Sequence, residues 1–297
     1  MDRRLDRGQP GRVAAVVLHF LLVFEFDILM GYAVVSVIVA YLVRLRDRAV
    51  DRWIAAMAAL HVLMVAVGTL RLIGTDPRAD FDGRTTLFTR GSWADQVEAR
   101  IHDWVAYRTE SIFIVPMCVA LFLVGVRLLR AGAFEDTPAG ARLRRILMIA
   151  GLCVAAPLNL LTTYAGPSWF LVNRYLLPPI VALGLLGLIT TLALRPLTRA
   201  EPGAMRRGLT AVGRTCLSCY VFQNLVASAL CYGWGLGLAA SLADLRPWWT
   251  LAAWAGICAI SMPLAAGWLR RFDRGPLELL WRRAYRPPHP ALEAADR

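Results

Sequence analysis

The sequence predicts an all-α integral membrane protein, a bundle of about eight transmembrane helices in a single membrane domain that covers residues 1–297. The chain is 58% hydrophobic and only 18% charged, with a mean hydropathy of +0.52, whereas soluble domains are nearer half apolar and a quarter charged. Its long apolar runs approach the roughly 20 residues that a helix needs to cross a bilayer. Its basic residues are all Arg, and they gather in alternate gaps between these runs.

Eight apolar runs are candidate spans, and the first is the shortest. One long polar gap interrupts them at residues 75–109. Trp, Val, Ile and Tyr recur at helical spacing in its second half, which predicts a short amphipathic helix that lies on the membrane surface. The candidate spans lie near residues 12–24, 28–43, 53–74, 110–130, 143–164, 169–194, 208–230 and 247–269.

The distribution of Arg predicts the topology, because positive charge is retained on the cytoplasmic side of a membrane. Both tails and every second gap together hold 25 of the 33 Arg, and the other eight fall mostly in the acidic 75–109 gap. We therefore expect cytoplasmic termini, a cytoplasmic tail at 270–297 and an extracytoplasmic 75–109 loop, in the cytoplasmic (inner) membrane of a bacterium. Placed this way, the net charge of +12 indicates contact with the lipid bilayer rather than with nucleic acid.

His19 and Asp27 are the candidate catalytic residues. Ionisable groups are costly inside a membrane and are therefore functional candidates. If the chain turns at Glu25–Asp27, a carboxylate would lie over His19, an arrangement that suits a general base or a group that accepts a proton or an acyl unit. The same residues also suit a buried, hydrogen-bonded His and a helix cap. His61 lies in the middle of a span, where packing or a structural hydrogen bond is the favoured interpretation.

Five polar residues near or within the later spans are candidate substrate-binding residues. Asn159 and Tyr164 end the fifth span, Arg174 opens the sixth, and Tyr220 and Gln223 lie within the seventh. Each could bind a polar substrate or form hydrogen bonds between helices. The guanidinium of Arg174 could also clamp a phosphate or carboxylate, or anchor its helix at the interface.

Several kinds of chemistry have no motif in the sequence. It contains no phosphate-binding GxxxxGK[ST] loop, no DDxxD cluster and no GxSxG nucleophile elbow. Cys216 and Cys219 form a lone CxxC within a helical stretch, and a zinc site normally needs four ligands. We therefore predict no metal site, and the pattern itself identifies no cofactor.

Three segments resemble a bacterial membrane family, the domain of unknown function 418 or YeiB-like proteins. LHFLLVFEFDILMGYA resembles its His, Gly-Asp-Ile-Leu and Tyr-Ala sequence. VGRTCLSCYVFQNLVASALCYGWGLGL and RFDRGPLELLWRRAYR resemble its Val-Gly-Arg and Gly-Pro-Leu-Glu motifs. Two features depart from the family pattern. Its first two spans, with an Asp-x-Leu-Arg-Gly motif, have no counterpart here, and Phe26 replaces the Gly before the matched Asp.

The resemblance implies a function. The family is similar to a wider superfamily of membrane acyltransferases, which includes heparan-α-glucosaminide N-acetyltransferase. The resemblance implies that His19 acts as a base or a transient acyl carrier and that Asp27 orients it. It also implies that the acyl donor is an acyl-CoA. Further residues match family positions to which the resemblance assigns no role: Arg214, Tyr220, Gln223, Gly275, Pro276 and Glu278.

The first hypothesis is therefore an acyltransferase that moves an acyl group onto a small metabolite, lipid or glycan. Two alternatives remain open at this point: a permease or exporter for a small acid or amphiphile, and a non-catalytic membrane scaffold. The oligomeric state is not predicted.

Overall fold

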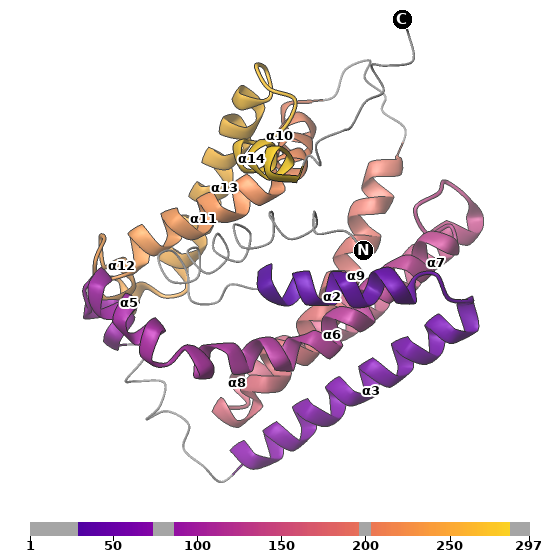
Figure 1. Cartoon of the computed structure of the whole chain (residues 1–297), viewed down its shortest axis with the longest axis horizontal. Coiled ribbons are helices and arrows are strands. Elements are labelled where there is room, and N and C mark those ends of the chain that lie inside the picture. Colours follow the sequence, from indigo (N-terminus) through magenta and orange to yellow (C-terminus); the bar gives the residue numbers. More distant parts are fainter. Residues whose placement is uncertain (1–28, 74–85, 196–202, 286–297) are drawn as a thin grey trace, which may run out of the picture. The chain divides into compact units, whose positions relative to one another are not determined.

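The fold is all-helical throughout the residues that the computed structural model describes, which are 29–73, 86–195 and 203–285 (Figure 1). This confirms the predicted fold class. The described residues divide into two compact units, each of which is considered by itself. We call residues 29–73 and 103–195 the α3–α6 unit, and residues 86–102 and 203–285 the α11–α13 unit.

The α3–α6 unit consists of long helices joined by short turns. In its second half the chain passes through two π-helices and a short 3-10 helix. Its elements are α2 Leu29–Leu42, α3 Asp47–Leu72, α6 Trp104–Arg130, α7 Pro138–Met148, η1 Ile149–Ala155, α8 Ala156–Tyr164, η2 Pro167–Trp169, η3 Val172–Leu176 and α9 Leu177–Leu194.

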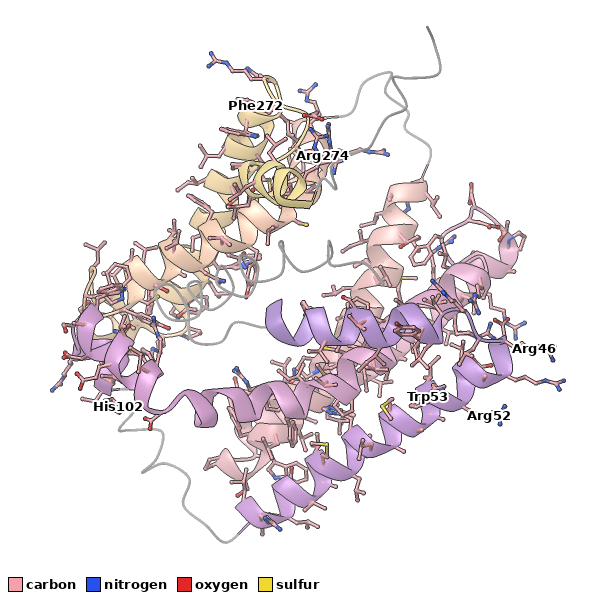
Figure 2. The ribbon with its side chains drawn as sticks, viewed as in Figure 1. Arg46, Arg52, Trp53, His102, Phe272 and Arg274 are labelled. Atoms are coloured by element: carbon pink, nitrogen blue, oxygen red, sulfur yellow. The ribbon has the colours of Figure 1, made fainter. Side chains whose placement is uncertain are left out.

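The α11–α13 unit is built around α13, which packs against α10 and α11. Where α13 ends, the indole of Trp268 stacks on Phe272 with ring centroids 4.2 Å apart, and its Nε1 donates to the carbonyl of Arg274. Figure 2 labels Phe272 and Arg274 after this helix. These contacts hold the turn into α14. The elements are α5 Trp93–His102, α10 Ala204–Arg214, α11 Cys216–Cys231, α12 Leu238–Ser241, η4 Ala243–Leu245, α13 Trp248–Trp268 and α14 Pro276–Tyr285.

Within the described residues, five helices are long and apolar enough to cross a membrane. Large apolar side chains remain exposed along them, and no more than 28% of the most apolar stretch of any one is buried. A lipid environment removes the cost of such exposure, because acyl chains are as apolar as the side chains. The molecule is therefore a polytopic membrane bundle. These helices are Asp47–Leu72, Phe113–Arg130, Pro138–Tyr164, Pro167–Leu194 and Trp248–Trp268, and Cys216–Cys231 is a shorter apolar helix.

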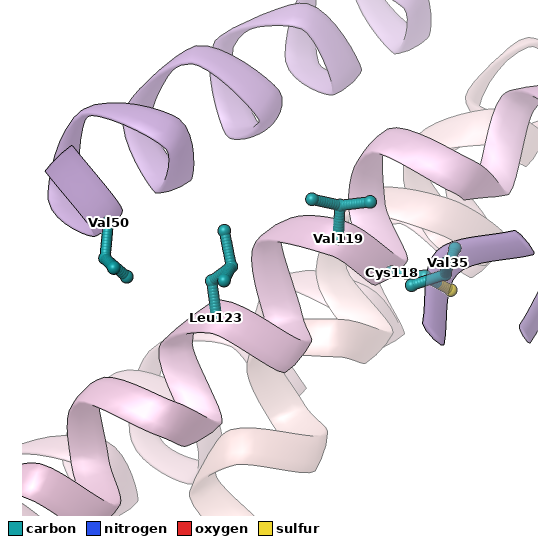
Figure 3. Packing of buried hydrophobic residues seen from close by; sticks show 5 residues of the cluster. All are labelled: Val35, Val50, Cys118, Val119 and Leu123. Atoms are coloured by element: carbon teal, nitrogen blue, oxygen red, sulfur yellow. The ribbon is translucent and has the colours of Figure 1, made fainter. Parts of the chain in front are cut away.

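A small hydrophobic cluster joins α2, α3 and α6. Val119 and Leu123 lie one turn apart on α6 and contact side chains of α2 and α3 (Figure 3). Most members are β-branched or small, so the helix backbones approach closely. Close packing of this kind stabilises helix pairs within a bilayer, where burial from water contributes little. The buried members are Val35, Val50, Cys118, Val119 and Leu123.

Two glycines bring η1 and α9 into backbone contact. A Cβ added to Gly151 would lie 2.5 Å from the Cα of Gly184, and one added to Gly184 would lie 2.7 Å from the Cα of Gly151. Neither position accepts even a methyl group without displacement of a helix. Gly is required at both positions because the backbones themselves are the contact surface.

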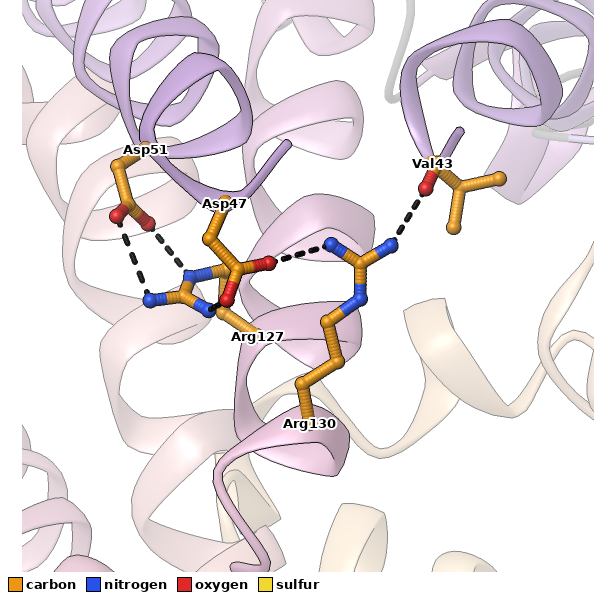
Figure 4. Close-up of polar contacts among 5 residues, drawn as sticks. All are labelled: Val43, Asp47, Asp51, Arg127 and Arg130. Carbon is orange, nitrogen blue, oxygen red and sulfur yellow. Dashed lines mark hydrogen bonds and ion pairs between the residues drawn. The ribbon is translucent and has the colours of Figure 1, made fainter. Parts of the chain in front are cut away.

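An ion-pair cluster connects the start of α3 to the end of α6 (Figure 4). Arg127 contacts the carboxylates of both Asp47 and Asp51, with N–O distances of 2.6 and 2.7 Å. Arg130 pairs with Asp47 at 2.7 Å and donates to the carbonyl of Val43. The cluster lies near the start of α3, where Arg46, Arg52 and Trp53 are found (Figure 2). Trp next to Arg is typical of a membrane–water interface.

We expect Arg127→Gln to lower the apparent unfolding temperature of the purified chain more than Arg130→Gln does. Arg127 serves two carboxylates, and its loss leaves Asp51 without its guanidinium partner. Both shifts should be small and should shrink in high salt, because the pairs are accessible to solvent. Arg142→Gln, on the exposed side of α7, is the control. Equal shifts for all three variants would contradict this account.

The structure differs from the predicted spans in several places. The segment 208–230 was predicted as one helix, but α10 ends at Arg214 and α11 begins at Cys216, with Thr215 in a non-helical conformation between them. Within the predicted loop 75–109, the expected short helix is present as α5, and α6 begins at Trp104, six residues before the predicted start of its span. The predicted span 12–24 lies outside the described residues.

Candidate functional site

The predicted catalytic pair, His19 and Asp27, lies outside the described residues. The site is therefore built from the other predicted residues. Asn159, Tyr164 and Arg174 belong to the α3–α6 unit, and Tyr220 and Gln223 belong to the α11–α13 unit.

Asn173 joins two polar segments that the sequence left separate. Its Nδ2 lies 2.7 Å from Oδ1 of Asn159, 2.7 Å from Oγ1 of Thr163 and 3.2 Å from Oγ1 of Thr162. The same nitrogen lies 2.9 Å from the carbonyl oxygen of Asn159. We call Asn159, Thr162, Thr163 and Asn173 the Asn173 cluster.

More oxygen atoms lie around the side-chain nitrogen of Asn173 than it has hydrogens to donate. The side-chain nitrogen of Asn173 carries two hydrogens, yet four oxygen atoms lie within 3.2 Å of it. The hydroxyls of Thr162 and Thr163 both donate to the carbonyl of Asn159 at 2.9 Å, so each hydroxyl oxygen can still accept. A cluster of this composition suits a ligand that presents hydroxyl or amino groups.

Arg174 adds positive charge next to the Asn173 cluster. Its side chain is exposed, its Nε donates to the hydroxyl of Tyr175 at 3.0 Å, and its guanidinium lies over the rings of Phe170 and Tyr175 at 5.8 and 5.5 Å. The two rings orient the guanidinium and leave it accessible to an anion. Tyr164, at the end of α8, is 87% exposed and we place it outside the cluster.

His61 reaches the same region from α3. It is buried, and its Nε2 lies 3.0 Å from the carbonyl oxygen of Tyr175. In an α-helix that carbonyl would bond to the N–H four residues later, which is Pro179 and has no hydrogen. Because a carbonyl only accepts, Nε2 carries the proton, and the lone pair of the neutral ring is on Nδ1. Within the described residues Nδ1 has no hydrogen-bond partner.

The burial and the hydrogen bond of His61 agree with its interpretation as a packing or structural residue. The sequence did not identify its partner, although Pro179 was a usable signal: a proline within a helix releases a carbonyl for a side chain. Tyr175 also lies in the π-helix η3, and π-helical segments are frequent at functional sites. No group of three or more His, Cys, Asp or Glu side chains comes together in the part of the chain that the structure describes.

In the α11–α13 unit, Glu278 of α14 caps the first turn of α11. Its Oε1 accepts from the backbone nitrogens of Leu217 at 2.8 Å and Ser218 at 3.2 Å, and its Oε2 accepts from the hydroxyl of Ser218. That hydroxyl oxygen in turn accepts from the nitrogen of Leu277 at 3.0 Å. A Cβ on Gly275 would lie 2.1 Å from Oε2 of Glu278, so a larger residue there would displace the carboxylate from its hydrogen bonds. We call Ser218, Gly275 and Glu278 the Glu278 cap.

The hydrogen bonds of Glu278 lower the pKa of its carboxyl group. Burial raises this pKa, but the bonds donated by Ser218 and Leu217 outweigh burial. Arg214, another family-matched residue, donates from Nη2 to the carbonyl of Asp273 at 2.8 Å. The structure thus brings Arg214, Gly275 and Glu278 together at one junction. The sequence resemblance matched these residues to family positions but assigned them no role.

Tyr220 and Gln223 do not take part in the Glu278 cap. Gln223 is exposed and Tyr220 is half-buried on α11. Asn224 and Ser228 lie one and two turns after Tyr220 on the same face of α11. They are buried, with side-chain atoms that have no hydrogen-bond partner among the described residues. Asn224 and Ser228 are therefore the buried polar residues of α11.

The fold and these polar clusters define a class: an all-helical, polytopic membrane protein with polar groups gathered at helix breaks. The chain belongs to the family described as "Protein of unknown function (DUF418)", whose sequence model matches residues 128–287, more than half of its length. The match includes the Asn173 cluster, Arg174 and the Glu278 cap. His19 and Asp27 lie outside it.

A relative of this chain is "Uncharacterized protein YxaH" of Bacillus subtilis (strain 168). The two are 22% identical over 285 residues, which cover 90% of this chain and 68% of the relative. No solved structure matches the chain.

Proposed function

We propose that the protein is a membrane-embedded acyltransferase that transfers an acyl group to a hydroxyl or amino group of a small metabolite, lipid or glycan. The protein would lie in the cytoplasmic membrane with eight spans, both termini on the cytoplasmic side and residues 75–109 outside. The sequence resemblance to membrane acyltransferases supports this reaction class. The Arg distribution supports this orientation.

In this proposal the two candidate catalytic residues have different roles. His19 takes the proton from the acceptor's O–H or N–H group, and Asp27 orients its ring. The acceptor's O or N then attacks the thioester carbonyl of an acyl-CoA donor. A new C–O or C–N bond forms, the C–S bond breaks, and coenzyme A leaves as the thiol with the proton that His19 returns. In a variant of the mechanism, His19 carries the acyl group transiently.

The observation that carries the proposal is the composition of the Asn173 cluster. Four oxygen atoms surround one nitrogen that can donate to two of them, so the others can accept from the hydroxyl or amino group of an acyl acceptor. Arg174 beside the cluster matches an anionic substituent. Two segments of chain that the sequence nominated separately contribute to it. A site built to bond a substrate hydroxyl discriminates strongly against analogues that lack it.

The test is mass spectrometry of lipid and metabolite extracts, with cells and medium analysed separately. The strains carry the wild-type chain, a deletion, or Asn173→Ala. We expect the deletion to accumulate a compound lighter by one acyl group. Asn173→Ala removes the amide that holds Asn159, Thr162 and Thr163 together, so it should bind the acceptor less well and raise the proportion of the unacylated compound in the extracts.

Thr191→Val is the matched control, because that hydroxyl donates to Gly187 within α9 and lies outside the cluster. A compound of unchanged mass that shifts between cells and medium would reject acyl transfer and favour a permease. Extracts that do not differ between wild type and deletion would favour a scaffold.

A further inference from the structure

The α11–α13 unit contains a cavity of about 370 Å³ between α10 and the end of α13, lined by four arginines. Arg206, Arg207 and Arg214 come from α10, and Arg270 follows α13. Thr210 adds a hydroxyl, and apolar side chains complete the wall. The cavity lies within the family-matched part of the chain.

The spacing on α10 explains why its basic residues face one cavity. Arg206, Thr210 and Arg214 recur every four residues and therefore share one face of the helix. Gly208 lies on the opposing face, where an added Cβ would be 3.1 Å from the Cβ of Met262 on α13. Glycine at this position brings α10 close to α13. The arginines on the other face line the cavity and are themselves exposed to solvent.

The lining of the cavity is basic. None of its lining residues is acidic. The carboxylate of Asp273 lies 3.9 Å from Arg282, and that of Glu278 is bound in the Glu278 cap. Arg214 meets a backbone carbonyl, that of Asp273, at 2.8 Å. Several guanidinium groups around one cavity repel each other, and a bound anion would relieve this repulsion.

We propose that this cavity is a binding pocket for a phosphate-bearing ligand. Guanidinium groups bind phosphate through paired N–H···O bonds, and several of them around one space favour a group with more than one negative oxygen. A volume of about 370 Å³ holds a phosphate or diphosphate group with its neighbouring atoms. The phosphate belongs either to a soluble molecule such as coenzyme A or to the headgroup of an anionic phospholipid. The pocket does not depend on the proposed acyl transfer.

The experiment uses the purified full-length chain in phosphatidylcholine nanodiscs. One arm titrates coenzyme A and, separately, inorganic pyrophosphate, and measures binding by calorimetry. The other arm offers phosphatidylglycerol in mixed nanodiscs and measures lipid retained on the protein by native mass spectrometry. We expect tight binding in one arm, which identifies the source of the phosphate, and an affinity that falls as salt rises.

The double variant Arg206→Gln/Arg270→Gln should weaken that binding about tenfold or more, because each charge-assisted hydrogen bond is among the stronger ones in proteins. The control is Arg142→Gln/Arg145→Gln, which removes the same charge from exposed positions of α7 and should leave binding unchanged. Unfolding curves establish that both variants are folded. Absence of binding in both arms, or equal weakening in the control, would overturn the proposal.

Discussion

Replacing His19 by Ala should abolish formation of the acylated product while the chain remains inserted in the membrane. A general base in this position contributes about 10²–10⁴-fold to the rate, and the chain has no Lys that could replace it. Cells with this variant should therefore accumulate the same compound, lighter by one acyl group, as the deletion strain. The measurement is the ratio of the two compounds in extracts, together with the amount of protein in the membrane fraction.

His102→Ala is the matched control for this experiment. The side chain of His102 is 75% exposed and lies 3.8 Å from Glu98, so its loss should leave the product unchanged. Asp27→Asn should slow the reaction less than His19→Ala does, because the orienting residue does not take the proton itself. A wild-type level of product in His19→Ala would remove His19 from the mechanism, whatever the reaction class.

Replacing Glu278 by Gln should destabilise the α11–α13 unit by about 1.5–3 kcal/mol, because hydrogen bonds to a charged group contribute that much. The carboxylate accepts from two backbone nitrogens and one hydroxyl in the first turn of α11. An amide has one oxygen, and its NH₂ group would face donors. The apparent unfolding midpoint of the purified chain in detergent measures the effect.

The pH dependence of stability should change in the same variant. The pKa of Glu278 is lowered in the folded chain from the ordinary value of 4.5. The charged form therefore stabilises the fold above pH 4.5, and this contribution disappears as the pH falls through the folded-state pKa. Glu278→Gln should lose that part of the pH dependence.

Glu98→Gln is the control for both measurements, because the side chain of Glu98 is 73% exposed. An unfolding midpoint equal to that of the wild type at neutral pH would contradict the structural role of the Glu278 cap.

The break between α10 and α11 shows the limit of hydropathy. Residues 208–230 are apolar enough to predict one helix, and the residue at the break is Thr215 rather than Pro. The structure ends α10 there because the next turn has its N–H groups bound by Glu278, about 60 residues later in the chain. A helix end created by a distant side chain leaves little trace in the local sequence.

The candidate site was likewise predictable from the sequence only in part. The polarity of Asn159, Arg174 and their neighbours within apolar runs was sufficient to nominate them. That Asn173 joins the two segments, and that His61 bonds to the carbonyl of Tyr175, required the folded chain.

The sequence by itself determined the helical class, the membrane setting and the family, because hydropathy, composition and motifs are local properties of the chain. Only the tertiary structure decided which helices end early, which polar groups meet and which arginines share a cavity. Those outcomes depend on contacts between residues far apart in the sequence, such as Ser218 with Glu278 and the α10 arginines with Arg270.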